Sequence, residues 1–121
     1  MAITSIVNTS LKRNEAKALT AGAAVEATLG ALITVNSDDQ KLLIRLQNSD
    51  ATTTHNAIIV KGNALQGVAD YEIELAPSAD KVVVVESGKF VNVSGDNKGK
   101  IVIKDEDTAS ELILVSAVEL P

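Results

Sequence analysis

After the first thirty residues of the chain, apolar and polar side chains alternate with the period of two that is typical of β-strands. Segment 40–47 shows this well, because Leu42, Ile44 and Leu46 share one face while most residues of the other face are polar. Segment 70–75 repeats the alternation, with glutamates between the apolar residues. The pattern predicts eight strands, at residues 31–35, 40–47, 56–61, 70–75, 81–86, 89–93, 100–104 and 111–120.

Turn-forming residues separate the predicted strands at intervals of about 8–12 residues, with clear clusters at Asn36–Asp39 and Gly95–Gly99. Short strands at this spacing are typical of a β-sandwich or barrel. No helical segment of about 10–15 residues lies between them, which argues against an α/β fold. We therefore predict an all-β fold, an antiparallel β-sandwich or jelly-roll-like domain with an extended N-terminal segment. The N-terminal arm is expected at 1–13 and a single domain at 14–121.

The first thirty residues allow two interpretations. Good helix formers follow Asn14, a residue that can cap a helix, so a short helix or turn at 14–19 is one of them. Gly22 opposes a longer helix at a cost of about 1 kcal/mol relative to alanine. Together with nearby β-branched residues, it favours the other interpretation, extended strands separated by a turn at Ala21–Gly22.

Some predicted strands are apolar on both faces. Segment 82–85 has valines on both sides. The last strand has two apolar sets on opposite faces, Leu112, Leu114, Val118 and Leu120 on one and Ile113, Val115 and Ala117 on the other. Such a strand needs cover on both sides, whereas a small antiparallel sandwich usually leaves one side of each sheet in water. The cover is either a loop or the N-terminal segment of the same chain, or a second subunit. We favour the subunit and expect a homo-oligomer.

Composition and charge narrow the choice of partners. The chain has 121 residues, enough for one domain, and a formal net charge of −5. Nucleic-acid-binding domains carry a basic surface, so this charge argues against nucleic acid. Tyr71 and Phe90 are the only aromatic residues, too few for the stacked rings that bind single strands or glycans. The absence of cysteine excludes disulfides, thiolate metal sites and cysteine nucleophiles.

No combination of residues predicts an active site. His55 is the only histidine and falls in a polar segment, so we interpret it as a solvated loop histidine and not as a catalytic base or zinc ligand. The acidic clusters Asp38–Asp39 and Asp105–Asp107 lack the spacing of a calcium loop. The segments Gly62–Gly67 and Gly95–Gly99 lack the terminal Gly-Lys-Ser/Thr of a phosphate loop. We therefore predict a protein that is not an enzyme, with no catalytic residue, no metal and no cofactor.

Neither a targeting signal nor a membrane helix is predicted. The first eight residues lack the basic stretch and long apolar segment of a secretory signal. The apolar runs, of about four residues, are far shorter than the ~20 residues that a membrane-spanning helix requires. We expect synthesis in a cytoplasm and no membrane partner.

Several short β and turn motifs occur in an order that resembles one protein family. They are Lys41–Asn48 (KLLIRLQN), Val60–Val68 (VKGNALQGV), Glu86–Gly95 (ESGKFVNVSG), Lys98–Ile103 (KGKIVI) and Ala117–Pro121 (AVELP). In this order they are similar to the small structural proteins of tailed bacteriophages that decorate the capsid, also called cement proteins. The resemblance covers residues 30–121.

The resemblance implies a β-sandwich or jelly-roll-like domain that binds the outer surface of an assembled capsid and stabilises contacts between major capsid subunits. It implies location on the virion, the major capsid protein as partner and a homo-oligomer, with a trimer favoured; it carries over no catalytic motif. We expect the arm at 2–11 to order on the capsid, so that its deletion abolishes capsid binding and leaves the domain folded. The predicted capsid or subunit interface comprises Ile3, Ile6, Val7, Leu11, Ile113 and Val115.

Two other functions are open at this point. Phage β-domains are reused in tails, which makes a tail or baseplate component one alternative. The other is a virion-displayed adhesion or ligand-binding module, for example for host glycans. The scarcity of aromatic residues weighs against a glycan site.

Overall fold

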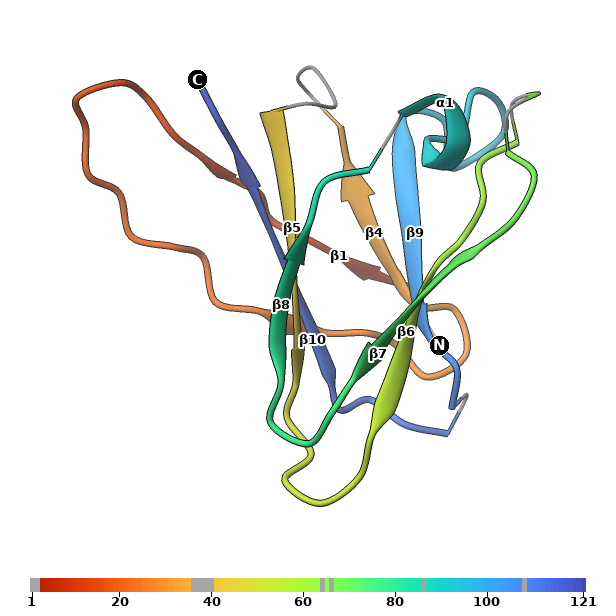
Figure 1. The fold of residues 1–121 in the computed structure, drawn as a ribbon. Helices are drawn as coiled ribbons and strands as arrows, with labels where there is room; N and C mark the ends of the chain where they lie inside the picture. Colours follow the sequence, from red (N-terminus) through yellow and green to blue (C-terminus); the bar gives the residue numbers. More distant parts are fainter. Residues whose placement is uncertain (1–2, 36–40, 64, 66, 86, 108) are drawn as a thin grey trace.

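The chain folds into two β-sheets that face each other across a hydrophobic core, as the computed structural model in Figure 1 shows. The structure describes residues 3–121 except residues 36–40, 64, 66, 86 and 108. The predicted all-β fold and its sandwich architecture are confirmed. The predicted turn at Asn36–Asp39 lies outside the described residues.

Each sheet combines strands that are far apart in the sequence. The first sheet contains, in spatial order, β1 (Thr4–Ser5), β4 (Ala31–Thr34), β9 (Lys100–Asp105), β6 (His55–Ile59) and β7 (Tyr71–Leu75). The second sheet contains β2 (Thr9–Ser10), β10 (Ile113–Glu119), β5 (Leu42–Asn48) and β8 (Asp80–Val83), and β3 (Ala23–Ala24) also pairs with β10. Neighbouring strands are antiparallel, except that β1 with β4 and β2 with β10 are parallel.

Alternate residues of the strands fill the space between the sheets. In β5, Leu42, Ile44 and Leu46 are buried, as the alternation predicts, and Asn48 continues the buried face. The β9 strand adds Ile103, which is fully buried. Burying an aliphatic side chain of this size stabilises a fold by about 1.5–3 kcal/mol. The core between the sheets is therefore a main source of stability.

The N-terminal segment is part of the sandwich. Residues 4–10, which we call the N-terminal strap, pair with β4 of the first sheet through β1 and with β10 of the second through β2. The N–H of Ile6 donates to the Leu32 carbonyl at 2.9 Å, and the Ile6 side chain enters the core. The N–H of Leu11 donates to the Glu119 carbonyl, also at 2.9 Å. The expected arm is thus folded onto its own domain.

Between the strap and β3 the chain forms an exposed loop. Asn14 has a φ of 61° in a turn near its start, and the rest of the loop has no regular secondary structure. Of the short helix or turn expected at 14–19, only a turn at residues 13–14 forms, and no turn forms at Ala21–Gly22. The N–H of Thr20 donates to Thr9 Oγ1 of β2 at 2.8 Å, which ties this end of the loop to the second sheet.

The predicted strand at 89–93 is wrong, because Ser87–Phe90 forms a single helical turn, α1. The difference comes from its neighbour Gly62. The Gly62 N–H donates to the Lys89 carbonyl at 2.8 Å, and a Cβ on residue 62 would lie 2.6 Å from the Val91 carbonyl oxygen. The segment therefore bonds to a closely packed loop instead of joining a strand ladder. No described helix is long and apolar enough to cross a membrane.

The other seven predicted strands are present, with ends shifted by at most three residues. The face of β10 that carries Ile113 and Val115 is buried in the core. On its outer face Leu114 is half-buried, and a Cβ on Gly22 would lie 3.1 Å from the Leu114 Cβ. Part of the second apolar face of β10 is therefore covered by the same chain.

Candidate binding surface

The structure divides the six residues of the predicted interface by burial. Three lie in the hydrophobic core: Ile6, Ile113 and Val115. Their side chains are not available to a partner, and we remove them from the candidate interface. Ile3 and Leu11 are half-buried, and Val7 is 70% exposed. The sequence showed that the last strand has two apolar faces, but the face that packs inward depends on the neighbouring sheet.

A different surface lies where the two sheets end side by side. β7 and β8 are the last strands of their sheets, and the short connection between them keeps them on the same side of the sandwich (Figure 1). Within the described part of the chain, neither strand has a strand neighbour on its outer edge. An unpaired strand edge offers backbone N–H and C=O groups to another chain. We call residues 68–75 and 80–85 the edge surface.

Apolar side chains of the edge surface face solvent. Val82 is 65% exposed, and Val68, Tyr71 and Val84 are also exposed. Beside them lies a hollow of about 500 Å³, which we call the edge groove. The rings of Tyr71 and Phe90, with centroids 6.4 Å apart, form part of its wall. Exposed apolar groups beside an unpaired strand edge are typical of a surface that binds another protein chain.

The β7 side of the edge surface is acidic. Asp70, Glu72 and Glu74 are all exposed there. Lys81 Nζ of β8 donates to the Glu74 carbonyl oxygen at 2.8 Å, which links the two edge strands. The remaining excess of carboxylates along β7 favours a basic partner.

Two carboxyl groups meet next to β7. Asn56 Nδ2 donates to Glu72 Oε1 and to Glu106 Oε2, both at 2.8 Å. Hydrogen bonding between the two carboxyl groups raises the pKa of Glu72 and lowers the pKa of Glu106. Glu72 lies in β7 and Glu106 follows the end of β9, so no local sequence motif indicates that the two are close. Both glutamates add to the negative charge of the surface next to β7.

An ion pair holds β8 in its sheet. Arg45 Nε of β5 lies 3.0 Å from Asp80 Oδ1 and 3.1 Å from Asp80 Oδ2. The guanidinium lowers the pKa of Asp80, chiefly through this hydrogen bond. The pair is exposed and contributes little to stability. The position of β8 beside β5 comes from the antiparallel backbone ladder between the two strands.

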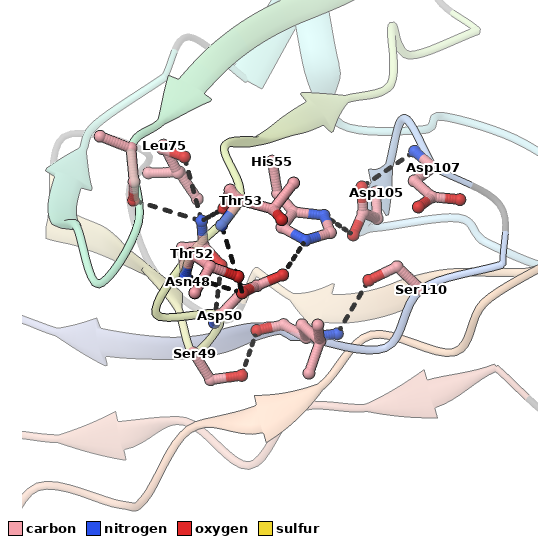
Figure 2. A network of polar contacts seen from close by, with 12 residues as sticks. Asn48, Ser49, Asp50, Thr52, Thr53, His55, Leu75, Asp105, Asp107 and Ser110 are labelled. Atoms are coloured by element: carbon pink, nitrogen blue, oxygen red, sulfur yellow. Dashed lines mark hydrogen bonds and ion pairs between the residues drawn. The ribbon is translucent and has the colours of Figure 1, made fainter.

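Polar contacts also gather around His55 at the start of β6 (Figure 2). The prediction of a solvated loop histidine is wrong, because His55 is buried. Its Nε2 lies 3.2 Å from Asp50 Oδ2, and its Nδ1 lies 3.1 Å from Asp105 Oδ2. Asp105 ends β9 and is itself 3% exposed. The ring is thus held between carboxylates from two distant parts of the chain.

The loop at residues 48–54 places the His55 ring in this buried position. The N–H of Thr52 donates to Asp50 Oδ1 at 2.9 Å. This bond, followed by the hydrogen bond to His55, lowers the pKa of Asp50 to about 2. Asn48 Nδ2 donates to the Leu75 carbonyl at 3.1 Å and so connects the loop with the end of β7. Residues 48–55 are therefore folded tightly over one end of the sandwich.

The geometry around His55 favours a structural role. Both ring nitrogens lie within 3.2 Å of a carboxylate oxygen and the ring is buried, so its neighbours hold the side chain in place. Among the residues that the structure describes, no three or more His, Asp or Glu side chains are grouped so that they could hold a metal ion. A hollow of about 360 Å³ lies beside this network, but its polar lining does not offer the apolar side chains and free strand edge of the edge surface, which we take as the candidate site.

The sequence carried one signal for the edge surface. The valines of segment 82–85 pointed to a strand with two apolar faces, and Val82 and Val84 are exposed. Comparison with known proteins found no family model, no curated protein and no solved structure that matches the chain.

Proposed function

We propose that this protein is a structural component of a tailed-bacteriophage virion. In this proposal it decorates the outer capsid surface as a homo-oligomer, with a trimer favoured, and stabilises contacts between major capsid subunits. The observation that carries the proposal is the edge surface, where two unpaired strand edges lie beside exposed apolar side chains. The resemblance of residues 30–121 to decoration proteins supplies the biological setting.

The edge surface supports a role in joining protein subunits. A chain that pairs with β7 or β8 gains main-chain hydrogen bonds, and it also covers Val82 and Val84. Interfaces between subunits depend on this combination of apolar burial and complementary polar groups. Neither the apolar burial nor the main-chain hydrogen bonding requires a reactive side chain.

An oligomer suits the surface of a capsid. A capsid presents the same contact many times, so several linked copies bind several capsid subunits at once. Linked contacts raise the overall affinity far above that of a single contact. Each copy then needs only a modest contact to the capsid, while the oligomer holds neighbouring capsid subunits together.

Co-sedimentation with purified phage particles tests the proposal. The full chain is incubated with heads lacking it, and separately with tails, of the phage whose genome encodes it. We expect binding to heads, followed by a regular position on the outer shell in cryo-electron microscopy. The variant V82K/V84K is expected to lose at least about tenfold in affinity, because it disrupts the oligomer that gives avidity. L112K is the matched control, since Leu112 is also exposed but lies outside the edge surface.

The outcomes separate the candidate functions. Binding to heads that is weakened by V82K/V84K and not by L112K supports a decoration protein. Binding to tails alone overturns that proposal in favour of a tail or baseplate component. Failure to bind either particle overturns both.

A further inference from the structure

One exposed loop stands out from the body of the molecule. Residues 12–19, which we call the basic loop, are all exposed, and they lie in the red-to-orange segment that extends away from the sandwich in Figure 1. A turn at residues 13–14 is the local structure of the loop, and in the described part of the chain no backbone hydrogen bond joins it to the sandwich. Exposed loops of this kind are preferred sites of proteolytic cleavage.

The basic loop also offers the side chains that one class of protease recognises. Its basic residues are Lys12, Arg13 and Lys17. Trypsin-like proteases bind such a side chain in a pocket that contains a carboxylate. The other described lysines and arginines lie in strands or in α1, or have a hydrogen-bonded backbone group, as at Lys41, Lys61 and Lys98. Cleavage at those residues requires the fold to open first.

Lys17 is the best placed of the three basic residues. A protease binds residues on both sides of the bond that it cuts as an extended strand. The two residues on each side of Lys17 are exposed members of the loop. Leu11, which precedes Lys12 and Arg13, is instead held by the hydrogen bond from its N–H to the Glu119 carbonyl at 2.9 Å. Cleavage after Lys12 or Arg13 therefore requires this bond to open.

The Lys17 side chain has one hydrogen bond to give up. Its Nζ donates to the Ser10 carbonyl oxygen at 3.2 Å, in an exposed position. Water competes for such a bond, so its net contribution is small. The side chain can therefore leave the loop and enter the pocket of a protease.

The N-terminal strap is held by contacts that a cut in the basic loop does not touch. Its strands pair with β4 and β10, and the Ile6 side chain lies in the core. Asn8 Nδ2 donates to the Thr34 carbonyl oxygen at 2.7 Å and to Glu119 Oε1 at 2.6 Å. All of these strap residues precede the loop. The strap should therefore stay bound after the chain is cut.

We propose that the basic loop is a processing site for proteases that cleave after basic residues, with Lys17–Ala18 as the preferred bond, and that the cut protein retains its strap as a bound peptide. The protease adds water across this peptide bond, which leaves a carboxylate on Lys17 and an amino group on Ala18. This processing goes beyond the proposed function and does not depend on it.

The cut makes the place of the strap a peptide-binding site. Residues 1–17 become a separate peptide that adds an extended strand to β4 and another to β10. Ile6 supplies the aliphatic side chain that enters the core, and Asn8 supplies the polar contacts. Val7, between them, is 70% exposed. The site should therefore select an extended segment with an aliphatic residue two positions before an asparagine.

Brief digestion of the purified full chain with trypsin, followed by mass spectrometry, tests the processing site. We expect the first cut after Lys17, with cleavage in the sandwich at least about a thousandfold slower, because those bonds open only with the fold. K17Q should slow the first cut by about twofold to tenfold, the cost of opening the Leu11–Glu119 bond. K12Q/R13Q is the matched control and should not change the first cut. Circular dichroism confirms that each variant is folded.

Size-exclusion chromatography of the cut wild-type protein tests the bound strap. Both fragments should elute together in native buffer and separately in denaturant. A fluorescent synthetic peptide of residues 1–17 should then exchange into the cut protein. An unlabelled I6A peptide should compete at least about tenfold more weakly than the wild-type peptide, because it leaves a cavity in the core. A V7A peptide is the matched control and should compete like the wild type.

The outcomes are distinct. A folded chain that resists trypsin, or that is cut first in the sandwich or after Lys12 or Arg13, overturns the processing site. Loss of residues 1–17 from the cut protein overturns the bound strap, and so does equal competition by the I6A and V7A peptides. Head binding is measured on the uncut chain, so a failure of the decoration role leaves this result unchanged.

Discussion

At the start of β6, two carboxylates hold the only histidine of the chain, and each comes from a different direction. Asp50 belongs to the loop that precedes the strand, while Asp105 ends the neighbouring strand β9. The ring therefore connects a local loop with a residue fifty positions further along the sequence. The stability of this end of the sandwich should therefore depend on the two carboxylates beside the ring.

The first prediction concerns Asp50. Its pKa in the folded chain is about 2, below the ordinary value of 3.8. Because folding favours the charged form, the carboxylate stabilises the fold fully above its ordinary pKa, and this stabilisation is lost as the pH falls towards about 2. We expect D50N to have a lower free energy of unfolding than the wild type at neutral pH, with a difference that shrinks between about pH 4 and pH 2. Urea unfolding across this range measures it.

Thr54, an exposed residue of the same loop, provides the control. Threonine does not titrate, so T54A should differ from the wild type by a constant amount over the same range. A D50N variant that also differs by a constant amount would contradict the stabilising role given to the Asp50 charge.

A second prediction at this scale concerns His55. The variant H55A leaves the buried Asp105 carboxylate without the imidazole beside it. We expect a loss of about 1–3 kcal/mol in the free energy of unfolding, the cost of leaving a buried polar group without its neighbour. The double variant H55A/D105N should recover part of this loss, because a buried amide costs less than a buried carboxylate. No recovery in chemical denaturation would show that burial of Asp105 is not the cause.

Among the elements, β4 depends on the residue before it. Gly30 has a φ of 85°, and its carbonyl accepts the N–H of Thr4 from the strap at 3.0 Å. A Cβ on residue 30 would lie 2.3 Å from the carbonyl oxygen of Ile103 in β9. The start of β4, its pairing with β9 and the attachment of β1 therefore meet at one glycine.

The third prediction follows from this crowding. G30A should lower the free energy of unfolding by more than about 2 kcal/mol, because backbone strain adds to a clash with a strand carbonyl. G95A is a matched control: Gly95 has a φ of 82°, but nothing lies within 4 Å of an added Cβ. We expect about 1–2 kcal/mol for it from strain alone. Thermal and urea unfolding measure both variants. If G30A and G95A lose the same free energy of unfolding, the proposed clash is contradicted.

At the same scale, the period-two pattern predicted the longer strands and missed the short ones. Seven strands could be predicted because each buries alternate side chains over several residues. The strands β1 and β2 have two residues each, too few for a period, and they form because the strap pairs with distant partners. The helical turn α1 depends on Gly62, a contact that no local sequence pattern contains.

For the whole molecule, the proposed self-association through the edge surface predicts that thermal stability depends on protein concentration. A partner that binds only the folded chain raises the midpoint of thermal unfolding as its concentration increases. The fourth prediction is therefore that the midpoint for the wild-type chain rises with protein concentration, whereas that of V84K does not. Circular dichroism melts at two concentrations about tenfold apart measure this. A concentration-independent midpoint for the wild type would argue against self-association.

The fifth prediction concerns the strap. Deleting residues 2–11 removes Ile6 from the core and both parallel strand pairs, so the domain is not expected to stay as stable as the sequence alone suggested. We expect a loss of at least about 2–5 kcal/mol, the cost of losing one large buried side chain. The exposed edges of β4 and β10 should also promote aggregation. Thermal unfolding and light scattering report both effects. V7S alters an exposed strap residue and should change neither.

The candidate site was less predictable than the fold. The alternation indicated strands with two apolar faces, but burial depends on which face meets the other sheet. Ile113 and Val115 therefore proved to be core residues, while Val82 and Val84 face solvent. The edge surface itself arises from the order of strands in two sheets, and sequence periodicity does not contain that order.

The parallel pairing of β2 with β10 has a mechanical consequence. The two strands point the same way, so tension applied at the two ends of the chain would slide Thr9 and Ser10 along Val118 and Glu119. Every hydrogen bond of the pair then bears load at once instead of opening one after another. The Leu11–Glu119 bond adds resistance in the same direction. The fold thus places a pairing that resists shear between its first and last segments.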